Sequence, residues 1–230
     1  MIIQYLPLLR TAPLEFAVVV AAFAASMLLG LIFHEYCHAW VANRLGDPTP
    51  RLSGRLTLDP RSHYDPIGTT MILFAGFGWA KPVPVNPNYT SNPKRSLLLI
   101  SLAGPASNLV VAFLAGLPIR FGLFDQPFVG ASVGLIGFFL FVVVYLNVLL
   151  AVFNMLPIPP LDGSKVLMGL LPNDLARQYQ RLEPWGMGIL MLLIIAPFLT
   201  DGLVDLRVVT KPVTDFLLWL FIGSDPIGLG

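Results

Sequence analysis

Charged residues are scarce in this 230-residue chain. Lys, Arg, Asp and Glu together make up 12% of the sequence, whereas a typical soluble domain has roughly 25%. Hydrophobic residues make up 56%, which excludes a soluble enzyme and predicts a chain that crosses a membrane several times. We expect a single membrane-embedded domain, residues 1–230, because the length leaves no room for a second folded domain.

Other shortages limit the partners and the chemistry. One cysteine, Cys37, excludes an internal disulfide framework. The formal net charge of +1 provides no strongly basic surface, so we expect no nucleic-acid partner. The sequence has only three histidines, and two of them, His34 and His38, lie four residues apart.

Residues 34–38 read H-E-Y-C-H and follow an uncharged apolar run at 16–33. On a helix, residues four apart lie almost one above the other, about 6 Å along the axis, so His34 and His38 can bind one metal ion. Glu35 lies beside them and can take a proton from a metal-bound water, as in zinc hydrolases. Pentapeptides of this pattern also occur by chance in proteins that bind no metal. A histidine pair at the end of a membrane-length apolar segment is costly, however, which favours a functional role.

Several apolar segments are long enough to cross a membrane as helices. Shorter apolar segments at 66–80 and 214–222 are expected to be re-entrant or interfacial. Prolines at alternate positions, Pro82 and Pro84, forbid a helix there but allow an extended edge. The expected spanning helices are residues 14–45, 96–119, 128–153 and 184–200.

The basic residues predict the orientation of these helices, because Lys and Arg are more frequent in cytoplasmic loops. Ten of the fourteen fall on one side, which is therefore expected to be cytoplasmic. The segments at 14–45 and 128–153 then both end near the cytoplasmic face, so the polar residues at their ends come to the same depth. The ten are Arg44, Arg51, Arg55, Arg61, Lys81, Lys94, Arg95, Lys165, Arg177 and Arg181, and the other four are Arg10, Arg120, Arg207 and Lys211.

A catalytic zinc site needs a third protein ligand and one position for water. Residues 154–163 read N-M-L-P-I-P-P-L-D-G, and their prolines break the helix at membrane depth, which is tolerated only where the backbone is buried in protein or faces water. Asp162 is the carboxylate expected at the depth of the histidines, where a lone charge is costly unless a metal binds it. The alternative is that Asp162 caps the helix that starts near Gly163.

Three stretches together resemble the motifs of the site-2 protease family of intramembrane zinc metalloproteases. They are H-E-Y-C-H at 34–38, G-P-A-S-N at 104–108 and N-M-L-P-I-P-P-L-D-G at 154–163. The resemblance covers residues 14–172 and is to the compact bacterial and archaeal type, which has no PDZ or CBS domain. It implies an endopeptidase that hydrolyses transmembrane or membrane-associated proteins, with its active site toward the cytoplasmic side of the cell membrane.

The resemblance also implies the roles of individual residues. His34, His38 and Asp162 are implied to bind one zinc ion. Glu35 is then the general base, and Asn154 polarises the scissile carbonyl or holds the substrate.

Three further residues are expected to support the site or bind substrate. Segment 78–87 resembles the membrane-associated β-hairpin of the family's smaller members, and its edge at Val83 and Val85 is expected to pair with an unwound substrate strand. A solvated loop is the alternative. Asn108 is expected to support the metal site, with a polar contact between helices as the alternative.

The expected fold is an all-α polytopic membrane protein with about four spanning helices, re-entrant or interfacial segments and a small membrane-associated β-hairpin. Its expected partners are the lipid bilayer and transmembrane substrates, and homo-oligomerisation stays open. The competing hypothesis is a membrane metal transporter or metal-binding module, which would also use intramembrane His and Asp. A transporter is expected to carry repeated halves with paired polar sites, and the sequence shows no such repeat.

Overall fold

The computed structural model describes residues 7–75, 78–124 and 134–223. Every element within these ranges is a helix, which confirms the expected all-α fold. The elements outside the long helices are α1 (Leu8–Thr11), α3 (Thr49–Leu52), α4 (Pro60–His63), α5 (Pro66–Ala75), η2 (Pro87–Tyr89), α8 (Asp162–Leu170), η3 (Glu183–Trp185) and α11 (Arg207–Ile222).

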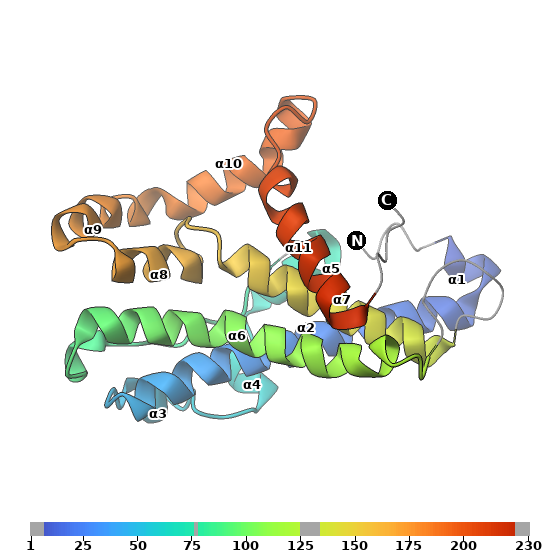
Figure 1. Ribbon diagram of the computed structural model, residues 1–230, viewed down its shortest axis with the longest axis horizontal. Coiled ribbons are helices and arrows are strands. Elements are labelled where there is room, and N and C mark those ends of the chain that lie inside the picture. The colour runs from blue at the N-terminus through green and yellow to red at the C-terminus, as the bar shows by residue number, and fades with distance from the viewer. Residues whose placement is uncertain (1–6, 76–77, 125–133, 224–230) are drawn as a thin grey trace.

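Three long helices form the body of the bundle and lie side by side along its long axis (Figure 1). They are α2 (Pro13–Arg44), α6 (Pro93–Arg120) and α7 (Leu135–Asn154). A fourth apolar stretch contains α9 (Asn173–Gln180) and α10 (Gly186–Leu199). The described residues therefore include four candidate spans by length and composition, which confirms the expected number.

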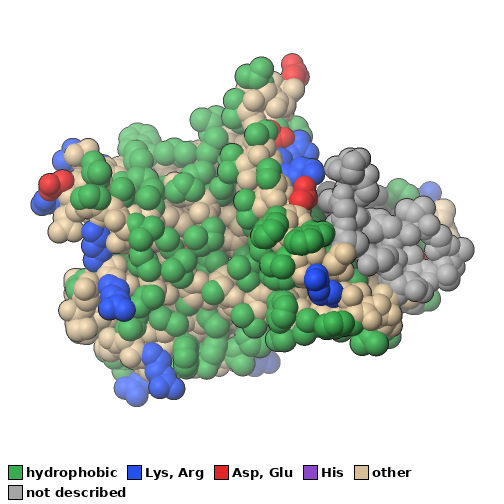
Figure 2. All heavy atoms as spheres, viewed as in Figure 1, with side chains coloured by type: hydrophobic (Ala, Val, Ile, Leu, Met, Phe, Trp, Pro, Cys, Tyr) green, Lys and Arg blue, Asp and Glu red, His purple; other side chains and the backbone are tan. Residues whose placement is uncertain are grey.

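The exposed surface of the bundle is apolar. Figure 2 shows hydrophobic side chains over the middle of one face, and a group of Lys and Arg side chains at the end formed by α3, α9 and the start of α6. Such a surface is stable in contact with lipid and not with water, because exposed apolar patches of this extent are rare on soluble monomers.

The start and end of α2 follow from local sequence. Pro13 occupies the first turn, where its missing N–H breaks no helical hydrogen bond. After Arg44 the chain turns through Gly46, whose φ is +105°. Residues other than glycine rarely adopt this backbone conformation. The Asp47 N–H then donates to the Ala42 carbonyl at 3.0 Å, which closes the helix within one residue of the expected boundary.

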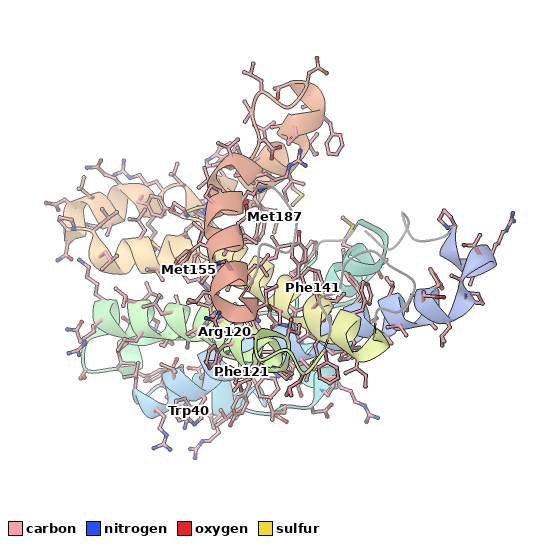
Figure 3. All side chains as sticks on the ribbon, turned by 45° about the vertical axis from the view of Figure 1, so that its right-hand side comes forward. Trp40, Arg120, Phe121, Phe141, Met155 and Met187 are labelled. Atoms are coloured by element: carbon pink, nitrogen blue, oxygen red, sulfur yellow. The ribbon has the colours of Figure 1, made fainter. Side chains whose placement is uncertain are left out.

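One core cluster lies where α11 crosses α6 and α7 (Figure 1). Leu218 and Ile222 of α11 are buried against Ile119 of α6 and Val144 of α7. The Arg120 side chain, labelled in Figure 3, donates to the Leu220 carbonyl at 2.6 Å.

The helix expected at 214–222 is present. The helix begins earlier, at Arg207, and Thr214, Leu218 and Ile222 form a buried stripe at helical spacing. One face of this helix therefore packs against α6 and α7.

The expected β-hairpin is not found in the described part of the chain. Residues 78–86 form an extended, irregular segment that leads into η2, and no strand is assigned there. Pro82 and Pro84 lack the N–H groups that a ladder of strand hydrogen bonds requires. Side chains bind this segment in place of a second strand.

We expect Leu218→Ala to lower the free energy of unfolding by about 2–5 kcal/mol, because it leaves a cavity at a fully buried site (0% exposed). Leu220→Ala is the matched control, since this side chain of the same helix is 42% exposed and its loss should cost less than about 0.5 kcal/mol. Unfolding of the purified protein in detergent measures both. Equal effects would contradict the packing of α11 against the bundle.

Candidate metal centre

His34 and His38 lie one turn apart on the same face of α2, and both are buried. Their ring centroids are 4.6 Å apart and their planes are nearly perpendicular, at 85°. The spacing of four residues brings both rings to one side of the helix, as the sequence predicts.

Asp162 approaches the histidines from the first residue of α8. Its Oδ2 atom lies 3.0 Å from His34 Nε2 and 3.2 Å from His38 Nε2. The helix-cap alternative is wrong, because Leu161 is the N-cap residue and no side chain caps this helix. The carboxylate faces the imidazoles instead.

The turn before Asp162 is fixed from both sides. The Tyr179 hydroxyl on α9 donates to the Pro157 carbonyl at 2.8 Å. At Gly163, an added Cβ would lie 2.3 Å from the Met155 carbonyl oxygen, so the close return of the chain requires glycine. These contacts hold Asp162 at the end of α7 and at the depth of the histidines.

One face of α6 supplies the groups around the imidazoles. The Asn108 Oδ1 atom lies 2.7 Å from His34 Nδ1, and the Ile100 carbonyl lies 2.6 Å from His38 Nδ1. Between them, at the same helical spacing of four, Gly104 leaves space for both rings. A Cβ at Gly104 would lie 2.4 Å from His38 Nε2 and 2.6 Å from His34 Nε2.

The orientation of the Asn108 amide is fixed by its other contacts. Its NH₂ group donates to the Gly30 carbonyl at 3.0 Å and to Asn147 Oδ1 at 3.1 Å. Asn147 in turn donates to the Val143 carbonyl at 2.9 Å. Oxygen is therefore the Asn108 atom that faces His34, and it can only accept a hydrogen bond.

This network decides which nitrogen of each histidine carries a proton. Because Asn108 Oδ1 and the Ile100 carbonyl are acceptors, Nδ1 of each ring donates, and the neutral ring keeps its lone pair on Nε2. Two Nε2 lone pairs and the Asp162 carboxylate then meet at one buried point, which is unfavourable unless a cation lies among them.

The donor set fits zinc. Two imidazole nitrogens and one carboxylate oxygen form a three-ligand set of the catalytic type, which leaves a fourth position for water. All three ligand atoms lie within 4.8 Å of one another.

Glu35 lies on α2 next to His34 and is half-buried. Its Oε2 atom accepts a hydrogen bond from the Val83 backbone N–H at 3.1 Å. Segment 78–86 therefore passes beside the metal centre and contacts the carboxylate that the sequence indicates as general base.

The remaining predicted residues lie at different places. Asn108 contacts His34 directly. Asn154 ends α7 and donates to the Leu150 carbonyl of its own helix at 3.0 Å. Val85 is half-buried, and among the described residues no hydrogen bond joins it to the metal centre.

The sequence did not predict three features of the site: the Ile100 carbonyl, the space left by Gly104 and the Asn147 amide. Gly104 lies in the G-P-A-S-N stretch, and its spacing of four from Ile100 and Asn108 could have indicated one face of a helix. A backbone carbonyl leaves no signal in sequence, and the intramembrane position of Asn147 is only a weak one.

Residues 130–196, which include Asn154 and Asp162, match the profile of peptidase family M50. The chain is similar to YwhC of Bacillus subtilis (strain 168), with 39% identity over 174 residues, 75% of this chain and 79% of the relative. It is also similar to Rip2 of Mycobacterium tuberculosis (strain ATCC 25618 / H37Rv), with 34% identity over 195 residues, 81% of this chain and 71% of the relative. Both relatives are provisionally named zinc metalloproteases. This chain belongs to peptidase family M50, the site-2 proteases.

An archaeal relative, MJ0611 of Methanocaldococcus jannaschii, is 34% identical over 142 residues, 60% of this chain and 64% of the relative, and is also provisionally named a zinc metalloprotease. No solved structure matches the chain significantly. As a member of family M50, the chain is a zinc-dependent membrane protease. The family and the names of its relatives favour this activity over metal transport.

We expect Gly104→Ala to abolish zinc binding, because its methyl group would overlap both imidazoles. Gly188→Ala is the control, since a Cβ there meets nothing within 4 Å, and this variant should bind stoichiometric zinc. Metal analysis of the purified proteins measures the difference. Full zinc content in Gly104→Ala would show that the ion binds elsewhere.

Proposed function

We propose that this chain is an intramembrane zinc endopeptidase, folded as one domain, 1–230, in which His34, His38 and Asp162 bind a single zinc ion. The observation that carries the proposal is the convergence of three ligand atoms within 4.8 Å of one another. Two of them come from His34 and His38 of α2, a helix apolar enough to span a membrane. When bound, zinc acts as a Lewis acid that makes a nucleophilic water available at neutral pH.

Glu35 is the proposed general base. Its carboxylate adjoins the metal ligands in sequence and is oriented through Oε2 by the Val83 N–H. It accepts a proton from the attacking water and later donates one to the leaving amine nitrogen. The Asn154 amide is the proposed donor to the scissile carbonyl, a contact of a kind worth about 2.7–4 kcal/mol. To make it, Asn154 exchanges its present bond to Leu150.

The proposed substrates are transmembrane or membrane-associated proteins. A peptide bond inside a helix is shielded, so the substrate must unwind before hydrolysis. The extended edge at 82–85 offers backbone groups to the unwound strand, with Val83 and Val85 in contact with it. Among the described residues the Val85 N–H has no hydrogen-bond partner, so it is available to a substrate carbonyl.

We propose that the active site faces the cytoplasmic side of the cell membrane. The excess of basic residues on the loops at this end supports the orientation. Trp40, on the turn of α2 after the histidines, is 44% exposed, and Arg44 lies over its ring at 5.2 Å (Figure 3). Trp is enriched at membrane–water interfaces, which supports a position of His38 just inside the membrane.

Glu35→Gln tests the protease mechanism. We expect it to bind zinc as the wild type does and to cleave a single-span membrane substrate at least about 10²-fold more slowly, because the amide cannot accept the proton of water. Zinc analysis and a cleavage assay in detergent or liposomes measure the two properties separately. Undiminished cleavage by Glu35→Gln would remove Glu35 from the mechanism.

Val85→Pro tests strand pairing without touching Glu35. Loss of one backbone donor should lower kcat/KM on a membrane substrate by about 2- to 10-fold, the effect of one neutral hydrogen bond. A peptide too short to reach the segment at 82–85 should be cleaved at the wild-type rate. An equal loss on both substrates would argue against pairing at this edge.

A further inference from the structure

Two charged side chains are buried outside the metal centre. Asp47 is 0% exposed and Arg55 is 5% exposed. Neither forms an ion pair with any described residue. A buried charge without a counter-charge is unfavourable unless hydrogen bonds replace the lost water, so the partners of these two side chains indicate what they are for.

Arg55 binds backbone carbonyls. It donates to the Ser62 carbonyl of α4, to the Lys81 carbonyl at 3.3 Å and to the Pro82 carbonyl at 3.2 Å. A guanidinium presents five N–H groups in a rigid fork, so it can serve three acceptors at once. The Lys81 N–H adds a bond to the His63 carbonyl at 2.9 Å.

Asp47 binds backbone N–H groups at the other end of the same segment. Its carboxylate accepts from Asn86 N–H at 2.6 Å and from Thr49 N–H at 2.9 Å. Residues 81–86, called the strap below, are therefore held at one end by a buried cation and at the other by a buried anion. Each charge binds the backbone groups of opposite polarity.

The strap contacts the active site at one atom between these two ends. Pro82 and Pro84 have no N–H, so Val83 supplies the only backbone donor between Lys81 and Val85. That donor binds Glu35 Oε2 at 3.1 Å. A shift at either end of the strap would move this N–H relative to the carboxylate.

We propose that Arg55 and Asp47 are positioning residues for peptide hydrolysis. They fix the strap so that the Val83 amide holds the Glu35 carboxylate in the orientation in which it receives a proton. This inference rests on the proposed role of Glu35. It adds a requirement that the metal ligands do not supply, because His34 and Asp162 constrain the metal ion and not the carboxylate of Glu35.

The first test compares Arg55→Met, Arg55→Lys and the control Arg61→Met. Arg61 lies nearby in α4, and its side chain is exposed. With zinc retained, Arg55→Met should lower kcat about 10- to 100-fold, the range for one hydrogen bond to a charged group. Arg55→Lys should be intermediate, because one ammonium cannot reach three carbonyls, and Arg61→Met should equal the wild type. Wild-type kcat in zinc-loaded Arg55→Met would overturn the proposal.

A double-mutant cycle separates positioning from a general effect on the fold. Val83→Pro removes the N–H through which Arg55 is proposed to act. In that background Arg55→Met should lower kcat by less than about twofold, because residues acting through one contact are not additive. A further full loss would show that Arg55 acts independently of Glu35 and would overturn the inference.

Hydrogen exchange of the strap amides tests the same contacts without any cleavage. Arg55→Met should speed exchange at Lys81 and Val83, and Asp47→Asn should speed exchange at Asn86, whereas Arg61→Met should change none of them. Unchanged exchange in the first two variants would overturn the inference whether or not the protein cleaves a substrate. The variants could show faster exchange while the wild type cleaves no membrane substrate. That result would support the contacts of Arg55 and Asp47 with the strap and would count against the proposed function alone.

Discussion

Three lone pairs directed at one buried point are the constraint on which this structure depends. Two imidazoles and a carboxylate would repel one another there without a cation, and the surrounding bundle prevents them from turning away. His34 and His38 are held through Nδ1, and Asp162 is held by the start of α8. The packing of the protein therefore favours a cation bound at this point.

One face of helix α6 positions the two imidazoles. Ile100, Gly104 and Asn108 follow one another at four-residue spacing, so a single helical face provides an acceptor, a gap and a second acceptor. Because α2 is antiparallel to α6, the two acceptors match His38 and His34 in reverse order. The close approach of the helices depends on the missing side chain at the middle position. In a membrane, where helices gain little from hydrophobic burial, such small residues allow close packing.

Buried polar groups recur around the centre and form two systems. One comprises the amides of Asn108 and Asn147, which orient the ring of His34. The other comprises Asp47 and Arg55, which bind the backbone of a proline-rich segment in which no strand forms. In both systems, buried polar side chains fix the position of the group that they bind. The proposed metal ligands and the proposed general base are thus positioned by separate parts of the chain.

The sequence by itself determined the spans and the histidine pair, because apolar length and a spacing of four are local properties of a helix. The return of Asp162 to the histidines also followed from where each span ends. Only the tertiary structure decided that the Ile100 carbonyl, Gly104 and the Val83 amide lie at the site, and that one face of α11 is buried. These depend on contacts between residues 48 or more positions apart, and backbone groups, which make several of them, are the same at every position of a sequence.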